Sequence, residues 1–95
     1  MENINCHKAK ELIKKNDVIL LDVRTKNEYD NRHAEGALNI DYMSSDFEEK
    51  IEKLDKSKKY ILYCRSGARS GSAGMIMEKK GFKVYNVVEC ISKLF

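Results

Sequence analysis

Short apolar runs alternate along this chain with segments of helical spacing. Residues 18–21 (Val-Ile-Leu-Leu) form a continuous apolar run, the pattern of a strand that is covered on both faces of a sheet. Further strand-like stretches occur at residues 37–40, 59–63 and 82–88, and helical spacing separates each from the next. This alternation predicts an α/β fold, in which a central parallel sheet carries helices on both faces. Ligand sites in such sheets form beyond the carboxyl ends of the strands.

Capping signals predict where the helices begin. Asn5 can cap a helix that runs to about Lys15. The spacing of a capping box occurs at Thr25 and again at Ser45, each with a glutamate three residues later. A further helix ends near residue 80, where Gly81 supplies the stop.

Size and charge limit the range of functions. A chain of 95 residues fits one domain, residues 1–95, and a charged content of 35% beside a hydrophobic content of 42% is typical of a globular protein. The net charge is only +3, and acidic residues are interleaved with the lysines, so no concentrated basic face for a nucleic acid is expected. No apolar run reaches the length of a membrane span, and the first residues lack a secretion signal. We therefore expect no membrane partner and a cytoplasmic location.

Cys64 lies where a reactive thiol is expected. It follows the strand-like stretch 59–63 and precedes a helix, so it is predicted to occupy a tight loop at a helix N-terminus. Backbone N–H groups and the charges of Arg65 and Arg69 favour the thiolate, which is the reactive form. The alternative is a buried structural cysteine, but such residues usually have apolar neighbours rather than Arg, Ser and Gly.

Four motifs resemble the rhodanese-like (sulfurtransferase) family in its small single-domain form, over about residues 17–88. They occur in the family's order and spacing, and they are Ile19–Tyr29 with its Asp22-Val23-Arg24, His33–Ile40, the loop Tyr63–Ser70, and Gly81–Val87. The resemblance implies a three-layer fold with a central parallel five-stranded sheet, and a persulfide carried on Cys64 between two half-reactions. The chain departs from the family at Glu35, where a proline is usual, and at Glu89-Cys90, where a glycine pair is usual.

The resemblance also implies which residues surround the sulfur. Cys64 is the catalytic residue, and Gly67 can adopt the positive φ that a curled loop needs. Anionic donors such as thiosulfate are expected to bind the arginines of the loop. The predicted substrate-binding residues are Arg65, Ser66, Gly67, Ala68 and Arg69.

Three charged residues are predicted to support the loop structurally rather than catalytically: Asp22, Arg24 and Glu28. The alternative for Arg24 and Glu28 is an exposed helix pair with i, i+4 spacing, which would stabilise by about 0.3–0.5 kcal/mol. No metal site is predicted, because Cys6-His7 is too isolated to supply a ligand set, and no cofactor is expected.

Three functions are compatible with this sequence. The first is a sulfurtransferase that takes sulfane sulfur from thiosulfate or a persulfide and passes it to a thiol, cyanide or a protein acceptor. The second is a phosphatase or arsenate reductase, although only four residues separate Cys64 from Arg69, one fewer than in phosphatase-like relatives. The third is a non-catalytic binding module on the same fold.

The other two cysteines, Cys6 and Cys90, are expected to be thiols. An odd count of three does not suit a disulfide framework, and the cytoplasm is reducing. Cys90 directly follows the last strand, so it should lie at the same edge of the sheet as Cys64. It is either a small buried residue or a candidate resolving thiol that attacks the Cys64 persulfide.

Overall fold

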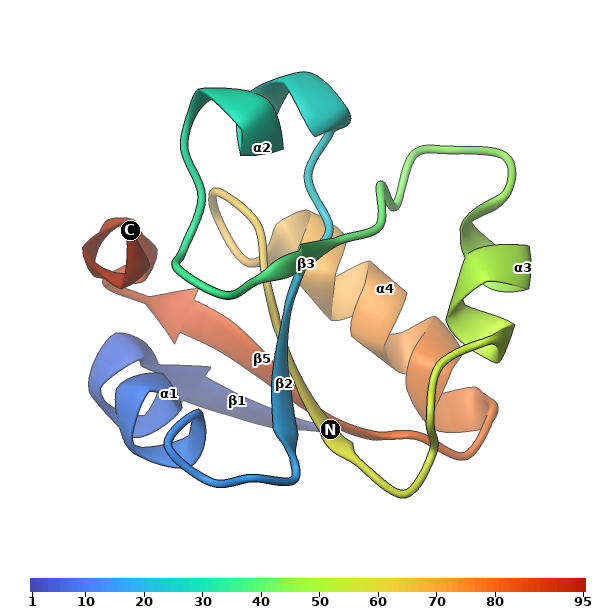
Figure 1. The fold of residues 1–95 in the computed structure, drawn as a ribbon, viewed down its shortest axis with the longest axis horizontal. Helices are drawn as coiled ribbons and strands as arrows, with labels where there is room; N and C mark the ends of the chain where they lie inside the picture. Colours follow the sequence, from blue (N-terminus) through green and yellow to red (C-terminus); the bar gives the residue numbers. More distant parts are fainter.

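Five parallel strands form the centre of the structure, a computed structural model that describes residues 1–95 (Figure 1). Their order in the sheet is β1-β5-β4-β2-β3, and every neighbouring pair is parallel. The predicted α/β fold with a five-stranded parallel sheet is confirmed. The strands are β1 (Glu2–Asn5), β2 (Val18–Asp22), β3 (Leu38–Asn39), β4 (Lys59–Tyr63) and β5 (Lys83–Glu89).

Helices cover both faces of the sheet and its carboxyl end. Figure 1 shows α3 and α4 on one face, α1 and the short 3₁₀ turn η1 on the other, and α2 beyond the end of β2. None of these helices combines the length and apolar content that crossing a membrane would take. The helices are α1 (Cys6–Leu12), α2 (Lys26–Asn31), α3 (Phe47–Glu52), α4 (Ala68–Lys79) and η1 (Ile91–Leu94).

The sheet divides the core in two, because alternate residues of a strand point to opposite faces. On β4, Leu62 packs with the cluster beneath α3 and α4, which includes Met77 and Ile51. Its neighbour Ile61 packs with the cluster beneath α1 and η1, which includes Leu12. Strand β4 is therefore covered on both faces. The same holds for β2, where Leu21 packs in the first cluster and Leu20 in the second, as its apolar run predicts.

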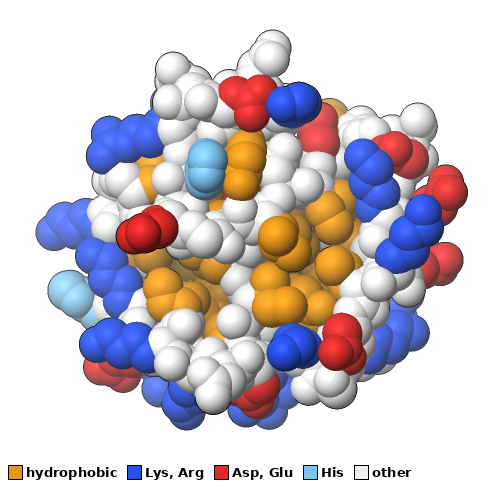
Figure 2. Space-filling view, in the orientation of Figure 1, with side chains coloured by type: hydrophobic (Ala, Val, Ile, Leu, Met, Phe, Trp, Pro, Cys, Tyr) orange, Lys and Arg blue, Asp and Glu red, His pale blue; other side chains and the backbone are white.

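One face keeps apolar side chains at its centre (Figure 2). Strand β3 has only two residues, so it pairs with Leu21 and Asp22 and leaves the first part of β2 uncovered. Leu38 of β3 is itself exposed. Around this centre, lysines and arginines alternate with acidic side chains, in keeping with the interleaved charges of the sequence (Figure 2).

Two of the three predicted caps are present. Asn5 Oδ1 accepts a hydrogen bond from Lys8 N at 2.9 Å, and Thr25 forms a complete capping box with Glu28 at the start of α2. The predicted cap at Ser45 is wrong. Helix α3 begins after Asp46, one residue later than the capping box requires, and the Asp46 side chain makes no capping hydrogen bond.

Strand β1 has no pattern in the sequence that predicts it. Only Ile4 of its four residues is buried, because β1 lies at the edge of the sheet and has one neighbour, β5. A single buried side chain gives neither the alternation nor the apolar run by which strands are detected. The fifth strand was implied by the family resemblance alone.

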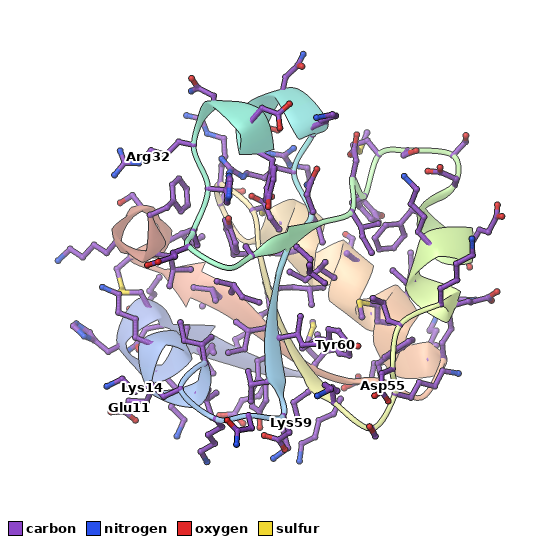
Figure 3. All side chains as sticks on the ribbon, in the orientation of Figure 1. Glu11, Lys14, Arg32, Asp55, Lys59 and Tyr60 are labelled. Atoms are coloured by element: carbon purple, nitrogen blue, oxygen red, sulfur yellow. A yellow bond between two sulfur atoms is a disulfide. The ribbon has the colours of Figure 1, made fainter.

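A disulfide joins Cys6 to Cys90, which corrects the prediction that both are thiols. Strands β1 and β5 are parallel neighbours, so they bring Cys6 and Cys90 to the same edge of the sheet, with Cα atoms 5.5 Å apart. The yellow sulfur–sulfur bond between α1 and η1 is visible in Figure 3. The resolving-thiol hypothesis is not supported, since the sulfur of Cys90 is bonded to Cys6 while Cys64, in the core beneath α3 and α4, is free.

A buried ion pair lies at the carboxyl end of β2. Asp22 and Arg24 are both buried, and the Arg24 guanidinium and backbone N–H donate to both carboxylate oxygens at 2.7–3.1 Å. The Tyr63 hydroxyl donates to Asp22 Oδ2 at 2.7 Å and accepts from Ala34 N at 3.0 Å. These bonds connect the ends of β2 and β4 to the loop that leads to β3.

Replacing Asp22 with Ala should destabilise the protein by about 3–5 kcal/mol, because it leaves the Arg24 guanidinium buried without its partner. Urea unfolding at pH 7 measures the loss. The matched control is Asp30→Ala, which removes the exposed pair between Lys26 and Asp30 and should cost less than about 1 kcal/mol. Equal losses in the two variants would contradict the importance of the buried pair.

Candidate active site

The Cys64 loop is a tight turn between β4 and α4. Gly67, directly before α4, has φ of +92°, the left-handed conformation that the sequence analysis expects of it. A Cβ atom there would also lie 3.4 Å from Val87 O and from the Val88 side chain on β5. Ser66 and Ala68 are exposed on the outside of the turn, where Ser66 Oγ accepts from Ala68 N at 3.4 Å.

The Cys64 sulfur is buried and held by hydrogen bonds from the loop. Gly67 N donates to Sγ at 3.1 Å, and Ser70 Oγ lies 3.4 Å away. Burial is the largest single influence and raises the pKa of the thiol. Hydrogen bonds from the Ser70 side chain and from the N–H groups of the loop and of Ser70 outweigh it together, so the pKa of Cys64 is lowered. The loop therefore favours the thiolate, as predicted, although hydrogen bonds contribute more than the expected arginine charges.

Ser70 and Asn86 form a buried polar pair that the sequence analysis did not assign to the site. Ser70 Oγ donates to Asn86 Oδ1 at 2.5 Å, and Asn86 Nδ2 donates to Gly67 O at 3.1 Å. A hydroxyl has one proton, so while Ser70 donates to Asn86 its oxygen can only accept from the Cys64 thiol. When Cys64 is ionised, the same hydroxyl can turn its proton to the sulfur. An asparagine amid the apolar residues of β5 was the signal available in the sequence, because a buried amide needs partners.

Arg69 is paired with Glu28. Its Nη1 and Nη2 atoms donate to the two carboxylate oxygens at 2.7 and 3.0 Å. These bonds, with the backbone N–H of Thr25, lower the pKa of Glu28 to about 2 against the effect of burial. The bidentate pair ties α2 to α4 across the loop, and it occupies the guanidinium that was expected to bind the donor. The i, i+4 pair between Arg24 and Glu28 is not formed, because Arg24 binds Asp22.

A pocket of about 320 Å³ opens beside the loop. Arg65 is exposed and has no hydrogen-bonding partner or ion pair, so its charge is available to this pocket. Arg32, which Figure 3 shows next to the C-terminal turn, donates to Phe95 O at 2.6 Å. The sequence does not predict that Arg32 and the C-terminal residues line this pocket, because contacts between residues 63 positions apart leave no local pattern. The lining residues are Arg24, Glu28, Asn31, Arg32, Arg65, Ile91, Ser92 and Phe95.

Positive charge predominates in this pocket. Asp22 neutralises Arg24 and Arg69 neutralises Glu28, while Arg32 donates to Phe95 O. The Arg65 guanidinium is left without a partner. Such a pocket suits a small anion. No group of three or more His, Cys, Asp or Glu side chains lies close enough together to hold a metal ion.

Known proteins resemble this chain over most of its length. The family described as Rhodanese-like domain matches residues 5–93. The thiosulfate sulfurtransferase GlpE of Coxiella burnetii (strain RSA 493 / Nine Mile phase I) is 36% identical over 81 residues, which cover 84% of this chain and 74% of GlpE. The putative sulfurtransferase YtwF of Bacillus subtilis (strain 168) is 38% identical over 73 residues, or 75% of this chain and 67% of YtwF.

Solved structures show the same fold. A rhodanese-like domain protein from Staphylococcus aureus superposes with a TM-score of 0.81 at 25% identity, covering 93% of this chain and 85% of that protein. SSP1007 from Staphylococcus saprophyticus subsp. saprophyticus superposes with a TM-score of 0.84 at 26% identity, covering 100% of this chain and 94% of that protein.

Replacing Ser70 with Ala should raise the pKa of Cys64, because it removes a hydrogen bond that favours the thiolate. The rate of alkylation by iodoacetamide, followed from pH 5 to 10, should then have its midpoint at a higher pH than in the wild type. Ser72→Ala, on the exposed side of the same helix, is the matched control and should leave the profile unchanged. Identical profiles for Ser70→Ala and the wild type would contradict this role.

Replacing Glu28 with Gln should destabilise the protein by about 1 kcal/mol at pH 7, since glutamine can keep the capping box but cannot pair its charge with Arg69. The pKa of Glu28 is lowered on folding, so this stabilisation is complete above its ordinary pKa and is lost as the pH falls toward 2. Urea unfolding at several pH values should show the two proteins converging below pH 3. Glu11→Gln, on the surface of α1, should have no such pH-dependent effect. A constant difference between Glu28→Gln and the wild type at every pH would be inconsistent with the ion pair.

Proposed function

The chain belongs to the rhodanese-like domain family, and from this premise we propose that it is a sulfurtransferase that carries sulfane sulfur on Cys64. The observation that carries the proposal is the environment of the Cys64 sulfur, which accepts a hydrogen bond from Gly67 N and whose pKa is lowered. The same N–H groups can stabilise the negative charge of a terminal persulfide sulfur.

The transfer takes place in two displacements. With thiosulfate as donor, the Cys64 thiolate attacks the outer sulfur, the sulfur–sulfur bond of thiosulfate breaks, and sulfite leaves with the electron pair. The product is a persulfide on Cys64. An acceptor thiolate or cyanide then attacks the outer sulfur of this persulfide and releases the Cys64 thiolate.

Arg65 is the residue that we expect to attract an anionic donor. It adjoins Cys64 in the chain, lines the pocket beside the loop and has no competing partner. Arg32 lines the same pocket and donates to Phe95 O. Arg69 acts instead as a support, because its pairing with Glu28 fixes α2 against the start of α4. Asp22 and Arg24 support the ends of the strands in the same way.

The other two functions considered for the sequence have less support. A phosphatase needs a guanidinium facing the loop to bind the oxygens of phosphate, whereas Arg69 is engaged by Glu28. A binding module without catalysis would have no need of a buried thiol with a lowered pKa. The donor is proposed to be thiosulfate or a persulfide, and the acceptor a thiol, cyanide or a protein, in the cytoplasm.

Incubation with thiosulfate should add one sulfur atom to the protein, and cyanide should then remove it. Intact-mass analysis measures both steps. Cys64→Ser should gain no sulfur, whereas Cys6→Ser should still gain one because Cys64 is unchanged. A stable mass in the wild type after thiosulfate and after a low-molecular-weight persulfide would contradict the proposed activity.

Replacing Arg65 with Ala should raise the KM for thiosulfate about tenfold, the effect of losing one charged hydrogen bond of roughly 1.5 kcal/mol. Arg65→Lys keeps the positive charge and should recover part of the loss. Steady-state kinetics with cyanide as acceptor measure the change. An unchanged KM in Arg65→Ala would show that another residue binds the donor.

A further inference from the structure

We propose that Cys6 and Cys90 form a redox modification site, and that their disulfide holds the pocket beside Cys64 in the form that binds anions. This inference rests on the sulfurtransferase function proposed above and adds a means of regulating it. Reduction of the disulfide is expected to weaken donor binding without altering the Cys64 loop.

Cys90 has an unusual backbone conformation. Its φ of +50° makes it the only residue other than glycine with positive φ in this chain. Residues with a side chain seldom adopt this conformation unless the surrounding structure holds them there. The disulfide to Cys6 is a covalent restraint of that kind, at a position where the related family usually has glycine. Reduction of the disulfide removes this restraint, so Cys90 can move to the negative φ that residues with a side chain prefer.

The residues that directly follow Cys90 form one wall of the anion pocket. Ile91, Ser92 and Phe95 line it together with Arg65. Ile91 is buried in the cluster that includes Leu12 of α1, so the disulfide and this apolar contact fix η1 against α1 together. A change of backbone conformation at Cys90 is therefore transmitted to the wall through a single peptide bond.

Contacts of Phe95 connect this wall to the charged side of the pocket. The Phe95 ring centre lies 4.8 Å from the guanidinium carbon of Arg24 and 5.7 Å from that of Arg32. Arg32 also donates to Phe95 O at 2.6 Å. Movement of η1 would therefore release Arg32 from its present position, and an anion would lose an ordered pocket.

A dithiol is the only reactant needed to reduce the disulfide between Cys6 and Cys90. Cys90 is partly exposed and Cys6 is buried, so a dithiol attacks the Cys90 sulfur and the Cys6 thiolate leaves. The second thiol of the dithiol then attacks the mixed disulfide and releases the Cys90 thiolate. The backbone N–H of Cys6 lies 3.2 Å from the Cys90 sulfur and can donate a hydrogen bond to the Cys90 thiolate. The dithiol is oxidised to its cyclic disulfide, the protein disulfide is reduced to two thiols, and a low-molecular-weight disulfide reverses the reaction.

The experiment compares the oxidised and reduced wild-type protein after removal of the redox reagent under anaerobic conditions. Alkylation of the unfolded protein followed by intact-mass analysis should find one thiol in the oxidised form and three in the reduced form. With cyanide as acceptor, reduction should raise the KM for thiosulfate about threefold to tenfold. An equal or lower KM in the reduced form, with the thiol counts verified, would overturn the proposal, as would three thiols after treatment with oxidised glutathione.

Two variants separate the disulfide from the backbone. Cys6→Ser together with Cys90→Ser removes the bond permanently, and its KM should match that of the reduced wild type and not respond to reductant. Cys6→Ser together with Cys90→Gly removes the bond but accommodates positive φ. Because glycine adopts positive φ without cost, the KM of this second variant should lie below that of the double-serine variant and closer to that of the oxidised wild type. A KM as high as that of the double-serine variant would show that the backbone conformation at residue 90 does not control the wall, and would also overturn the proposal.

A binding readout distinguishes this inference from the proposed function. Peptide mass analysis can measure how fast iodoacetate, an anion, alkylates Cys64 relative to neutral iodoacetamide. This ratio should fall on reduction of the wild type, whether or not Cys64 accepts sulfur from thiosulfate. If sulfur transfer is absent but the ratio falls, the proposed function fails and the redox site stands. An unchanged ratio would count against the redox site even in an active enzyme.

Discussion

The buried pair of Asp22 and Arg24 is the constraint on which the carboxyl edge of the sheet depends. Two opposite charges inside a small domain are tolerable only when hydrogen bonds satisfy their remaining polar atoms, and here the partners come from β4, β3 and the end of α2. Tyr63 binds Asp22 from the end of β4, and Arg24 donates to the Arg32 carbonyl at 2.5 Å. Asn39 Nδ2 donates to the backbone carbonyls of Asp22 and Arg24, both at 3.0 Å. Tyr63 immediately precedes Cys64, so the network fixes the point from which the loop begins.

The two arginines of the Cys64 loop have different roles. Arg69 was predicted from the sequence to bind the substrate, but its guanidinium pairs with both carboxylate oxygens of Glu28 and connects α4 to α2. Backbone N–H groups and Ser70 act on the sulfur, and Arg65 is left facing the pocket. These separate roles suit a reaction in which the charged sulfur on Cys64 stays buried while donors and acceptors bind and dissociate. Hydrogen bonds on a rigid turn hold a buried charge without having to reorganise, whereas a flexible surface arginine can attract anions of different shape.

Most features that depend on local periodicity or on a contiguous motif could be predicted from the sequence, although the cap at Ser45 could not. Strands β2, β4 and β5, the cap at Asn5 and the Cys64 loop all carry such signals, and the structure agrees with them. Two kinds of feature could not be predicted. Edge strand β1 buries a single side chain, and contacts such as Arg69 with Glu28 or Cys6 with Cys90 depend on how the strands are ordered in the sheet. The odd number of cysteines led to the wrong prediction that no disulfide forms. Cys6 and Cys90 are paired, and the unpaired third cysteine is Cys64, the proposed sulfur carrier.

Two sulfur centres coexist in this domain because the sheet keeps them apart. Strand alternation places Cys64 in the core beneath α3 and α4, while Cys6 and Cys90 connect elements that pack on the α1 face. A resolving thiol must meet its partner sulfur directly, which this separation does not favour. The C-terminal turn is the element that both centres share, since it begins at Cys90 and ends beside Arg24 and Arg32. A family that usually places glycines there obtains positive φ at no cost. This chain reaches the same conformation with a cysteine, and the turn thereby depends on an additional covalent bond that thiols can open.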